Sequence, residues 1–157
     1  MKNVKHFLSL LLLCLLGFVP AQAQSYEKGA LYHLSLPAKG LVVTLDAQGK
    51  LSLQKLDTAQ PGAHFVVSEL SGSWRFINPF RNLAVRTEAN TVEAGENNGS
   101  DEAQLWKTEA AGKALLLVPT NRPDMAMAAE GSALVLLRGC ATLKGIESID
   151  RVMGEIG

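Results

Sequence analysis

The chain has 157 residues, and its 15 basic and 15 acidic side chains give a formal net charge of zero at pH 7. Proteins that bind nucleic acid through its phosphates need a basic surface, so this balance excludes nucleic acid as an expected partner. Hydrophobic residues make up 47% of the sequence, and a chain of this length supports one domain with its own core rather than two.

The first residues have the pattern of a secretory signal peptide. Lys2 and Lys5 precede an apolar run at residues 7–18, and Ala21-Gln22-Ala23 matches the small-residue cleavage site of signal peptidase. The run is shorter than the roughly 20 residues that a bilayer span needs. We therefore predict an exported protein (periplasmic, cell-surface or secreted), cleaved near Ala23 and without a stable membrane span; an N-terminal membrane anchor is the alternative.

Removal of residues 1–23 leaves one domain at residues 24–157, in which Cys140 is the single cysteine. A lone cysteine cannot form an internal disulfide, so the stability of the domain has to come from packing. Because no histidine lies near Cys140 in the sequence, we expect it to be a small buried hydrophobe rather than a nucleophile.

Apolar residues recur at an offset of 42 positions, which indicates internal repeats. This offset places Tyr32-His33-Leu34-Ser35-Leu36-Pro37 above Trp74-Arg75-Phe76-Ile77-Asn78-Pro79. The predicted repeats span about residues 29–70, 71–111 and 112–157. The same step relates Leu41 to Leu83, Val43 to Val85 and Asp46 to Glu88, and it reaches Leu116, Val118, Met125, Met127 and Glu130 in the third copy.

Each copy is predicted to contain four short strands separated by turn-forming residues such as Asp46-Ala47-Gln48-Gly49. Gly or Pro recurs about every eight to twelve residues, a spacing typical of all-β barrels and sandwiches. Twelve short strands in three equal units predict an all-β fold, a pseudo-threefold β-trefoil in which three hairpins cap a six-stranded barrel; an immunoglobulin-like sandwich is the alternative. The predicted first strands are 31–36, 74–78 and 114–118, and the predicted last strands are 63–69, 103–109 and 149–155.

The stretch 103–107 is predicted to be extended, which puts Gln104 and Trp106 on one face and Leu105 and Lys107 on the other. At about 2 kcal/mol per buried large side chain, a core built around Trp106 stabilises the chain without disulfides. The predicted core consists of Leu34, Leu41, Val43, Val66, Phe76, Leu83, Val85, Trp106, Val118, Met125, Met127 and Val152.

Gln104-x-Trp106 follows the polar loop Asn97-Asn98-Gly99-Ser100-Asp101 at the end of a repeat of about 40 residues. This arrangement resembles the Q-x-W repeat of the ricin B-type lectins, and the resemblance covers about residues 28–156. It implies that the glutamine braces backbone groups of the turn and that the tryptophan fills the barrel. At the corresponding positions the first copy has His64-Phe65-Val66, and the third has Asp150-Arg151-Val152.

The resemblance also implies a sugar site that each repeat of this chain lacks in its usual form. A binding repeat of these lectins has an aspartate after the second strand's apolar residue, an aromatic platform near the end of the third strand, and an asparagine just before the glutamine. The acidic residues Asp46, Glu88 and Glu130 come two positions after the place of the aspartate. The matching positions are Thr44, Arg86 and Ala128 for the aspartate, Gln54, Gly95 and Leu137 for the platform, and Ala63, Ala103 and Ile149 for the asparagine.

The second copy comes nearest to a ligand site, because polar side chains cluster on its hairpin and loop. Sugars need hydrogen-bonding groups for adjacent hydroxyls and an apolar surface for the ring face. An ordinary solvated turn is the alternative interpretation, and Trp74 is interpreted as a barrel or rim residue rather than a platform. Asn98-Gly99-Ser100 also matches an N-glycosylation sequon. The candidate ligand-binding residues are Arg86, Glu88, Asn97, Asn98 and Asp101.

The sequence contains no recognisable catalytic, metal-binding or phosphate-binding motif, so we expect neither an enzyme nor a bound cofactor or metal. After the signal segment the histidines are His33 and His64, which lie in apolar stretches and are expected to be structural. The sequence therefore predicts an exported, non-catalytic binding module, with a glycan or glycoprotein as the ligand that the resemblance implies. The alternative is a protein-interaction or inhibitor module that binds no sugar.

Overall fold

The computed structural model describes residues 26–36, 39–55, 57, 59–111, 114–138 and 148–151. The predicted signal segment, Cys140 and Val152 lie outside these ranges. Within them, no helix combines the length and the apolar character needed to cross a membrane.

Twelve strands and two 3₁₀ turns are found in the described residues, and the strands fall into three successive groups of four, here called units one, two and three. Unit one contains β1 (Tyr32–Leu36), β2 (Leu41–Leu45), β3 (Leu51–Lys55), the 3₁₀ turn η3 (Pro61–Ala63) and β4 (Val66–Leu70). Unit two contains β5 (Ser73–Asn78), β6 (Leu83–Glu88), β7 (Thr91–Glu96), the 3₁₀ turn η4 (Glu102–Gln104) and β8 (Trp106–Ala111). Unit three contains β9 (Ala114–Pro119), β10 (Met125–Glu130), β11 (Ala133–Arg138) and β12 (Ser148–Arg151).

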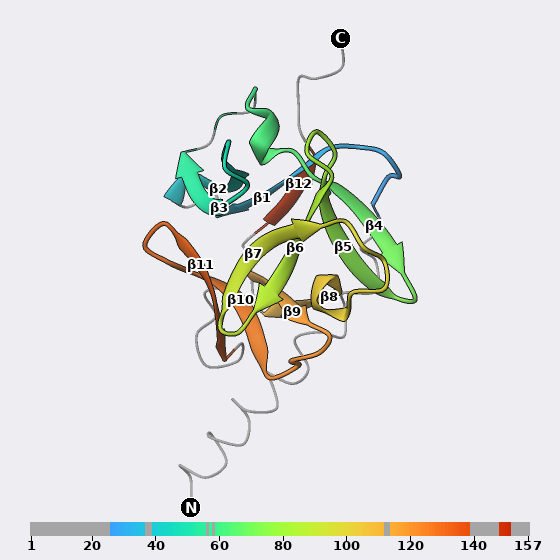
Figure 1. Ribbon diagram of the computed structural model, residues 1–157. Helices are drawn as coiled ribbons and strands as arrows, with labels where there is room; N and C mark the ends of the chain where they lie inside the picture. The colour runs from blue at the N-terminus through green and yellow to red at the C-terminus, as the bar shows by residue number, and fades with distance from the viewer. Residues whose placement is uncertain are drawn as a thin grey trace, which may run out of the picture.

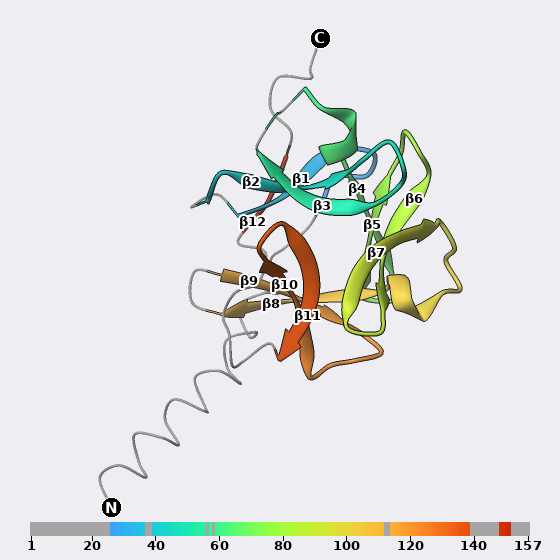
Figure 2. The same cartoon turned by 60° about the vertical axis from the view of Figure 1, so that its left-hand side comes forward.

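The strand pairing is that of a β-trefoil. The last strand of each unit pairs antiparallel with the first strand of the next, as β4 with β5, β8 with β9 and β12 with β1. The second and third strands of each unit form the hairpins β2–β3, β6–β7 and β10–β11. Figures 1 and 2 show the three units around a common centre. The predicted fold is confirmed, and the immunoglobulin-like sandwich is excluded.

Backbone hydrogen bonds between units hold the three hairpins together. The N–H of Leu53 donates to the carbonyl oxygen of Ser132 at 2.8 Å, and the N–H of Leu136 donates to that of Asn90 at 2.9 Å. These bonds satisfy backbone groups at the edges of the hairpins, where unpaired strands otherwise expose them.

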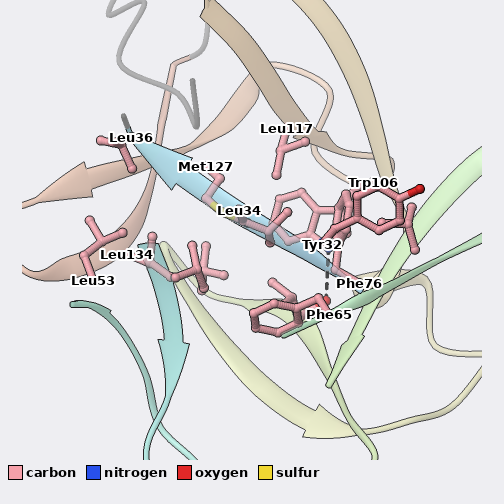
Figure 3. Packing of buried hydrophobic residues seen from close by; sticks show 14 of the residues in the cluster. Tyr32, Leu34, Leu36, Leu53, Phe65, Phe76, Trp106, Leu117, Met127 and Leu134 are labelled. Carbon is pink, nitrogen blue, oxygen red and sulfur yellow. Dashed lines mark hydrogen bonds between the residues drawn. The ribbon is translucent and has the colours of Figure 1, made fainter. Parts of the chain in front are cut away.

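The main hydrophobic core lies where the units meet, and side chains of β1 run through it (Figure 3). Six of the predicted core residues belong to this cluster: Leu34, Val43, Phe76, Val85, Trp106 and Met127. Four others are half-buried, namely Leu41, Val66, Leu83 and Met125. Of these, Leu41 and Met125 pack against the core cluster.

Unit three departs from the predicted offset in its first strand. Leu117 belongs to the main core, as does Phe76, which comes 41 positions earlier in the chain. Val118 is buried instead in a separate small cluster with Leu116 and Ala126. Side chains alternate between the two faces of a strand. An alignment that is wrong by one residue therefore assigns the core face to the residues next to the true core residues. The offset of 42 is therefore wrong by one at this strand.

The stretch 103–107 is not extended throughout, which corrects the prediction for Gln104. Asp101 caps the turn η4, with its Oδ1 accepting a hydrogen bond from the N–H of Ala103 at 3.0 Å, and β8 begins only at Trp106. Gln104 and Trp106 are both buried, at 1% and 0% exposure, but they do not share a strand face. The turn directs Gln104 back towards the preceding loop and Trp106 into the barrel.

Unit one contains the same turn one position away from the predicted alignment. Phe65 lies two residues after the end of η3, as Trp106 does after η4. In the β-pairing, Phe65 stands opposite Tyr32, and Trp106 stands opposite Trp74. Phe65 is 1% exposed and thus takes the place of Trp106, a role predicted for Val66. His64 was expected to lie within a strand. It is buried instead at the end of the turn η3.

Candidate functional site

An open polar pocket of about 510 Å³ lies between the β6–β7 hairpin and the loop that leads into η4. We call it the unit-two pocket. Four strand residues form its hairpin side, and four loop and turn residues form the rest. Its lining consists of Arg86, Glu93, Gly95, Glu96, Asn97, Asn98, Asp101 and Gln104.

Arg86, on β6, is the centre of the charge network in this pocket. Its Nη1 donates to Glu88 Oε2 at 2.8 Å and to Glu93 Oε1 at 3.0 Å, and its Nε donates to Asp101 Oδ2 at 3.2 Å. The hydrogen bond to Glu88 foremost, with those to Asp101 and Glu93, raises the pKa of Arg86 against the opposing effect of burial. Three carboxylates therefore neutralise this guanidinium, and it offers little net attraction to an anionic ligand.

Gly95 gives Arg86 the space to lie in this position. A Cβ atom on residue 95 would stand 2.4 Å from Cδ of Arg86, which is closer than two carbon atoms can approach. The stem of Arg86 thus fills the space beside the position where the resemblance to the ricin B-type lectins expects an aromatic platform. The unit-two pocket has no aromatic residue in its lining.

Gln104 braces the loop through both ends of its side-chain amide. Its Nε2 donates to the carbonyl oxygen of Glu96 at 2.6 Å, and its Oε1 accepts from the N–H of Asn98 at 3.1 Å. The indole Nε1 of Trp106 donates to the carbonyl oxygen of Val85 at 3.0 Å inside the barrel. These contacts match the structural roles that the resemblance implies for the two residues.

Arg75, on β5, supports the loop from beneath and was not anticipated from the sequence. Its side chain is only 8% exposed, and its Nη2 donates to Gln104 Oε1 at 2.8 Å and to Asn97 Oδ1. Burial lowers the pKa of Arg75, and the charge of Asp101 opposes this effect. No local pattern identifies the residue, since its partners lie 22 and 29 positions along the chain.

Four of the five candidate residues, Arg86, Asn97, Asn98 and Asp101, line the unit-two pocket. The fifth, Glu88, lies beside it, with 58% of its side chain exposed and an ion pair to Arg86. The structure therefore brings together all the side chains that were predicted to cluster.

Two of these residues are engaged in holding the loop. Asn97 Nδ2 donates to Asn82 Oδ1 at 2.9 Å, while its Oδ1 accepts from Arg75. Burial raises the pKa of Asp101, but the N–H of Ala103 and the guanidinium of Arg86 outweigh it, so the pKa lies below its ordinary value. Asn97 and Asp101 thus have structural partners for their polar atoms.

Glu93 and Glu96 are pocket residues that the sequence interpretation missed. Glu93 stands directly opposite Arg86 in the hairpin, and such an opposite-charge pair across two strands is a signal that could have identified it. In the described part of the chain, no hydrogen bond engages the Glu96 carboxylate, the second oxygen of Glu93 or Nδ2 of Asn98. These are the groups of the unit-two pocket that remain available to a ligand.

The equivalent positions in unit one are occupied differently. Thr44 is buried, and its Oγ1 donates to the carbonyl oxygen of Val42 at 3.2 Å. Asp46 Oδ1 accepts hydrogen bonds from the N–H groups of Gln48 and Lys50, so this carboxylate stabilises its own turn. Ala128 of unit three is also buried. A smaller open pocket of about 160 Å³ lies beside Asp46 in unit one, whereas the pocket of unit two measures about 510 Å³.

The sequence matches no protein-family model, and it matches no curated protein. Solved structures do resemble it. The GlcNAcα1-4Gal-releasing endo-β-galactosidase from Clostridium perfringens aligns with a TM-score of 0.70 and 14% identity, over 79% of this chain and 33% of that one. The chain thus spans about a third of the length of that enzyme.

Two further similar structures are matched over nearly their whole length. ThreeFoil, a designed threefold-symmetric protein, aligns with a TM-score of 0.63 and 11% identity, over 78% of this chain and 97% of that one. SeviL, solved with bound asialo-GM1 saccharide, aligns with a TM-score of 0.62 and 10% identity, over 78% of this chain and 95% of that one. At such identities the similarity shows the fold, and the chain is a β-trefoil.

Proposed function

We propose that the protein is a non-catalytic glycan-binding module, a divergent member of the ricin B-type lectins, and that the unit-two pocket is its site. The observation that supports this proposal most is the set of available polar groups in that pocket. The carboxylates of Glu93 and Glu96 can accept hydrogen bonds from sugar hydroxyls, and the amide of Asn98 can donate one. A shallow site with acceptors and donors side by side suits the adjacent hydroxyls of a sugar ring.

The surrounding contacts hold these groups in place before a ligand arrives. Gln104 fixes the backbone at Glu96 and Asn98, and Arg86 orients the carboxylate of Glu93. Binding to a site that is already ordered loses less conformational entropy than binding to a mobile loop. The ordered polar groups of this loop therefore favour a ligand that binds mainly through hydrogen bonds, such as a glycan.

The charge of the pocket narrows the class of glycan. One cationic residue, Arg86, and three acidic residues, Glu93, Glu96 and Asp101, line it, so the formal sum is +1 − 3 = −2. Like charges brought together across an interface disfavour binding. The proposed ligand is therefore a neutral sugar or one that bears an ammonium group, rather than a sialylated, sulfated or uronic acid glycan.

Glycan-array binding of the purified protein tests this proposal. Glu96→Gln and Asn98→Ala should each lower binding of neutral or amino-sugar glycans by at least about tenfold, which corresponds to about 1.4 kcal/mol. Glu102→Gln is the matched control, because Glu102 is an exposed acid of η4 that does not line the pocket. Glu88→Ala should have a smaller effect, because Glu88 contacts the pocket only through Arg86.

Binding of no glycan, or equal binding by the pocket variants and the parent, would refute the proposal. The protein-interaction or inhibitor module would then be the better interpretation. Phe80, which is 58% exposed on the loop after β5, would be the first residue to test for a protein contact. Export after cleavage near Ala23 and a domain spanning residues 24–157 are parts of the same proposal that rest on the sequence alone.

A further inference from the structure

A second concavity, of about 630 Å³, lies between the β4–β5 hairpin and the turn that precedes β1. We call it the Tyr26–Trp74 groove, and it shares no residue with the unit-two pocket. Its wall and rim include Tyr26, Lys28, Val66, Ser68, Glu69 and Trp74.

The backbone explains why a groove exists at this place. Tyr32 and Phe65 exchange backbone hydrogen bonds of 2.7 and 3.0 Å, which joins β1 to the residue just before β4. The pairing between these two segments does not continue towards the N-terminus. There the N–H of Ala30 donates a hydrogen bond to the carbonyl oxygen of Glu27 at 3.1 Å, which closes a turn. Gly29, with φ of 81°, allows this turn. The chain thus leaves the edge of β4 and opens a space beside it.

Two aromatic rings form part of the wall of this groove. The ring of Tyr26 lies edge-on to that of Trp74, with centroids 4.9 Å apart and an interplanar angle of 86°. Tyr26 also packs edge-on against Tyr32 of the core, at 5.3 Å. Burial raises the pKa of Tyr26 to about 12, with Tyr32 adding to the effect, so the phenol stays neutral. Trp74 is half-buried and lines the groove.

The rim of the groove carries balanced charge. Lys28 and Glu69 are both exposed and contribute opposite charges, and Ser68 of β4 adds a hydroxyl to the same wall. A neutral ligand with an apolar face and a polar edge complements this arrangement better than an ion does. A pyranose ring has this character, since its C–H face stacks on aromatic rings while its hydroxyls reach donors and acceptors at the edge.

We propose that the Tyr26–Trp74 groove is a second glycan site, in which a neutral sugar ring stacks on Trp74 and hydrogen-bonds to Lys28 and Glu69. The ligand class rests on the proposed function, whereas the site rests on a separate set of residues. The chain has two tryptophans, and Trp106 is fully buried. The sugar-stacking surface that is lacking at Gln54, Gly95 and Leu137 is supplied in this groove by Trp74.

Acrylamide quenching of tryptophan fluorescence tests the inference. Trp106 is shielded by burial, so quenching reports on Trp74. Lactose, cellotetraose and chitotetraose at millimolar concentrations serve as probes. At least one of them should protect the fluorescence from quenching. Trp106→Phe should keep this protection, and Trp74→Phe should keep the remaining emission but lose its dependence on sugar.

Calorimetric titration with the protecting sugar then locates the site. Trp74→Ala and Tyr26→Ala should weaken its affinity at least tenfold, and Glu69→Gln should weaken it severalfold, with far-UV circular dichroism confirming that each variant folds. Leu70→Ala is the control on the same strand, since Leu70 is 39% exposed and lies outside the groove. Glu96→Gln should remove only binding to the unit-two pocket, so the protection of Trp74 from quenching should persist in this variant.

Three results would overturn the inference. Protection by none of the sugars would show that the groove binds no neutral glycan. The glycan array would still test the unit-two pocket independently. Weakened calorimetric affinity in Glu96→Gln but not in Trp74→Ala would assign the sugar to the unit-two pocket alone. Protection by extended peptides and not by sugars would show that the edge of β4 is a peptide-binding site.

Discussion

Trp106→Ala tests the assignment of this residue to the centre of the barrel. The side chain is fully buried in the main core, and its indole N–H donates to the carbonyl oxygen of Val85. Truncation of a buried tryptophan costs about 3 to 5 kcal/mol, and the loss of a buried hydrogen bond adds about 1 kcal/mol. We therefore expect a loss near the upper end, about 4 to 5 kcal/mol. Trp74→Ala should cost only about 1 to 2 kcal/mol, because that ring is half-buried.

Urea unfolding followed by far-UV circular dichroism measures both losses without relying on tryptophan fluorescence. With a urea dependence of about 1.5 kcal/mol per molar, the midpoint should fall by about 3 M for Trp106→Ala and by about 1 M for Trp74→Ala. Trp106→Phe, which keeps most of the ring volume, should fall between the parent and Trp106→Ala. An equal or larger shift for Trp74→Ala would refute the placement of Trp106 at the barrel centre.

Three further changes test other contacts, each by its urea midpoint. Gly62→Ala should destabilise by about 1 to 3 kcal/mol, because its Cβ would lie 2.2 Å from the carbonyl oxygen of Leu45; an unchanged midpoint would contradict the packing of η3. Gln104→Leu should cost about 2 to 4 kcal/mol, since it leaves several buried groups of the loop without partners; a neutral result would contradict its bracing role. Burial raises the pKa of Glu109 against the opposing charge of Lys107, so its ionised form weakens the folded state above pH 4.5, its ordinary value. Glu109→Gln should therefore raise the midpoint at pH 7, and the gain should vanish below pH 4.5; a gain that persists at lower pH would contradict this explanation.

The threefold architecture could be predicted from the sequence because each unit repeats the same alternation of apolar residues. Leu34 with Phe76, and Val43 with Val85, are related by the offset of 42 and were placed correctly in the core. Periodicity alone could not locate shifts of one residue in the turns. The unit-one turn and the first strand of unit three each differ by one position, which moved the core role from Val66 to Phe65 and from Val118 to Leu117.

The candidate site was predicted as a cluster but not in its internal roles. Hairpin pairing and the short loop after β7 bring Arg86, Asn98 and Asp101 together, and both features are visible in the sequence. The division between residues that hold the loop and residues that remain available depends on distant partners such as Arg75. A sequence without the fold does not show which side chains meet over such separations.

Arg86 stands at the position where the resemblance to the ricin B-type lectins implies an aspartate. Its stem lies where a Cβ on residue 95 would stand, and its guanidinium is paired with three carboxylates. A larger residue at position 95 would therefore have to displace the Arg86 side chain from its present place. If the unit-two pocket binds a sugar, it does so through hydrogen bonds alone.

The crystal structure of the protein with the best glycan from the array tests the proposed function most directly. We expect density for a sugar in the unit-two pocket, within hydrogen-bonding distance of Glu93, Glu96 and Asn98. A second sugar on Trp74 would agree with the further inference without being needed for this one. Sugar density confined to the hairpins of units one and three, with the unit-two pocket empty, would contradict the proposed function.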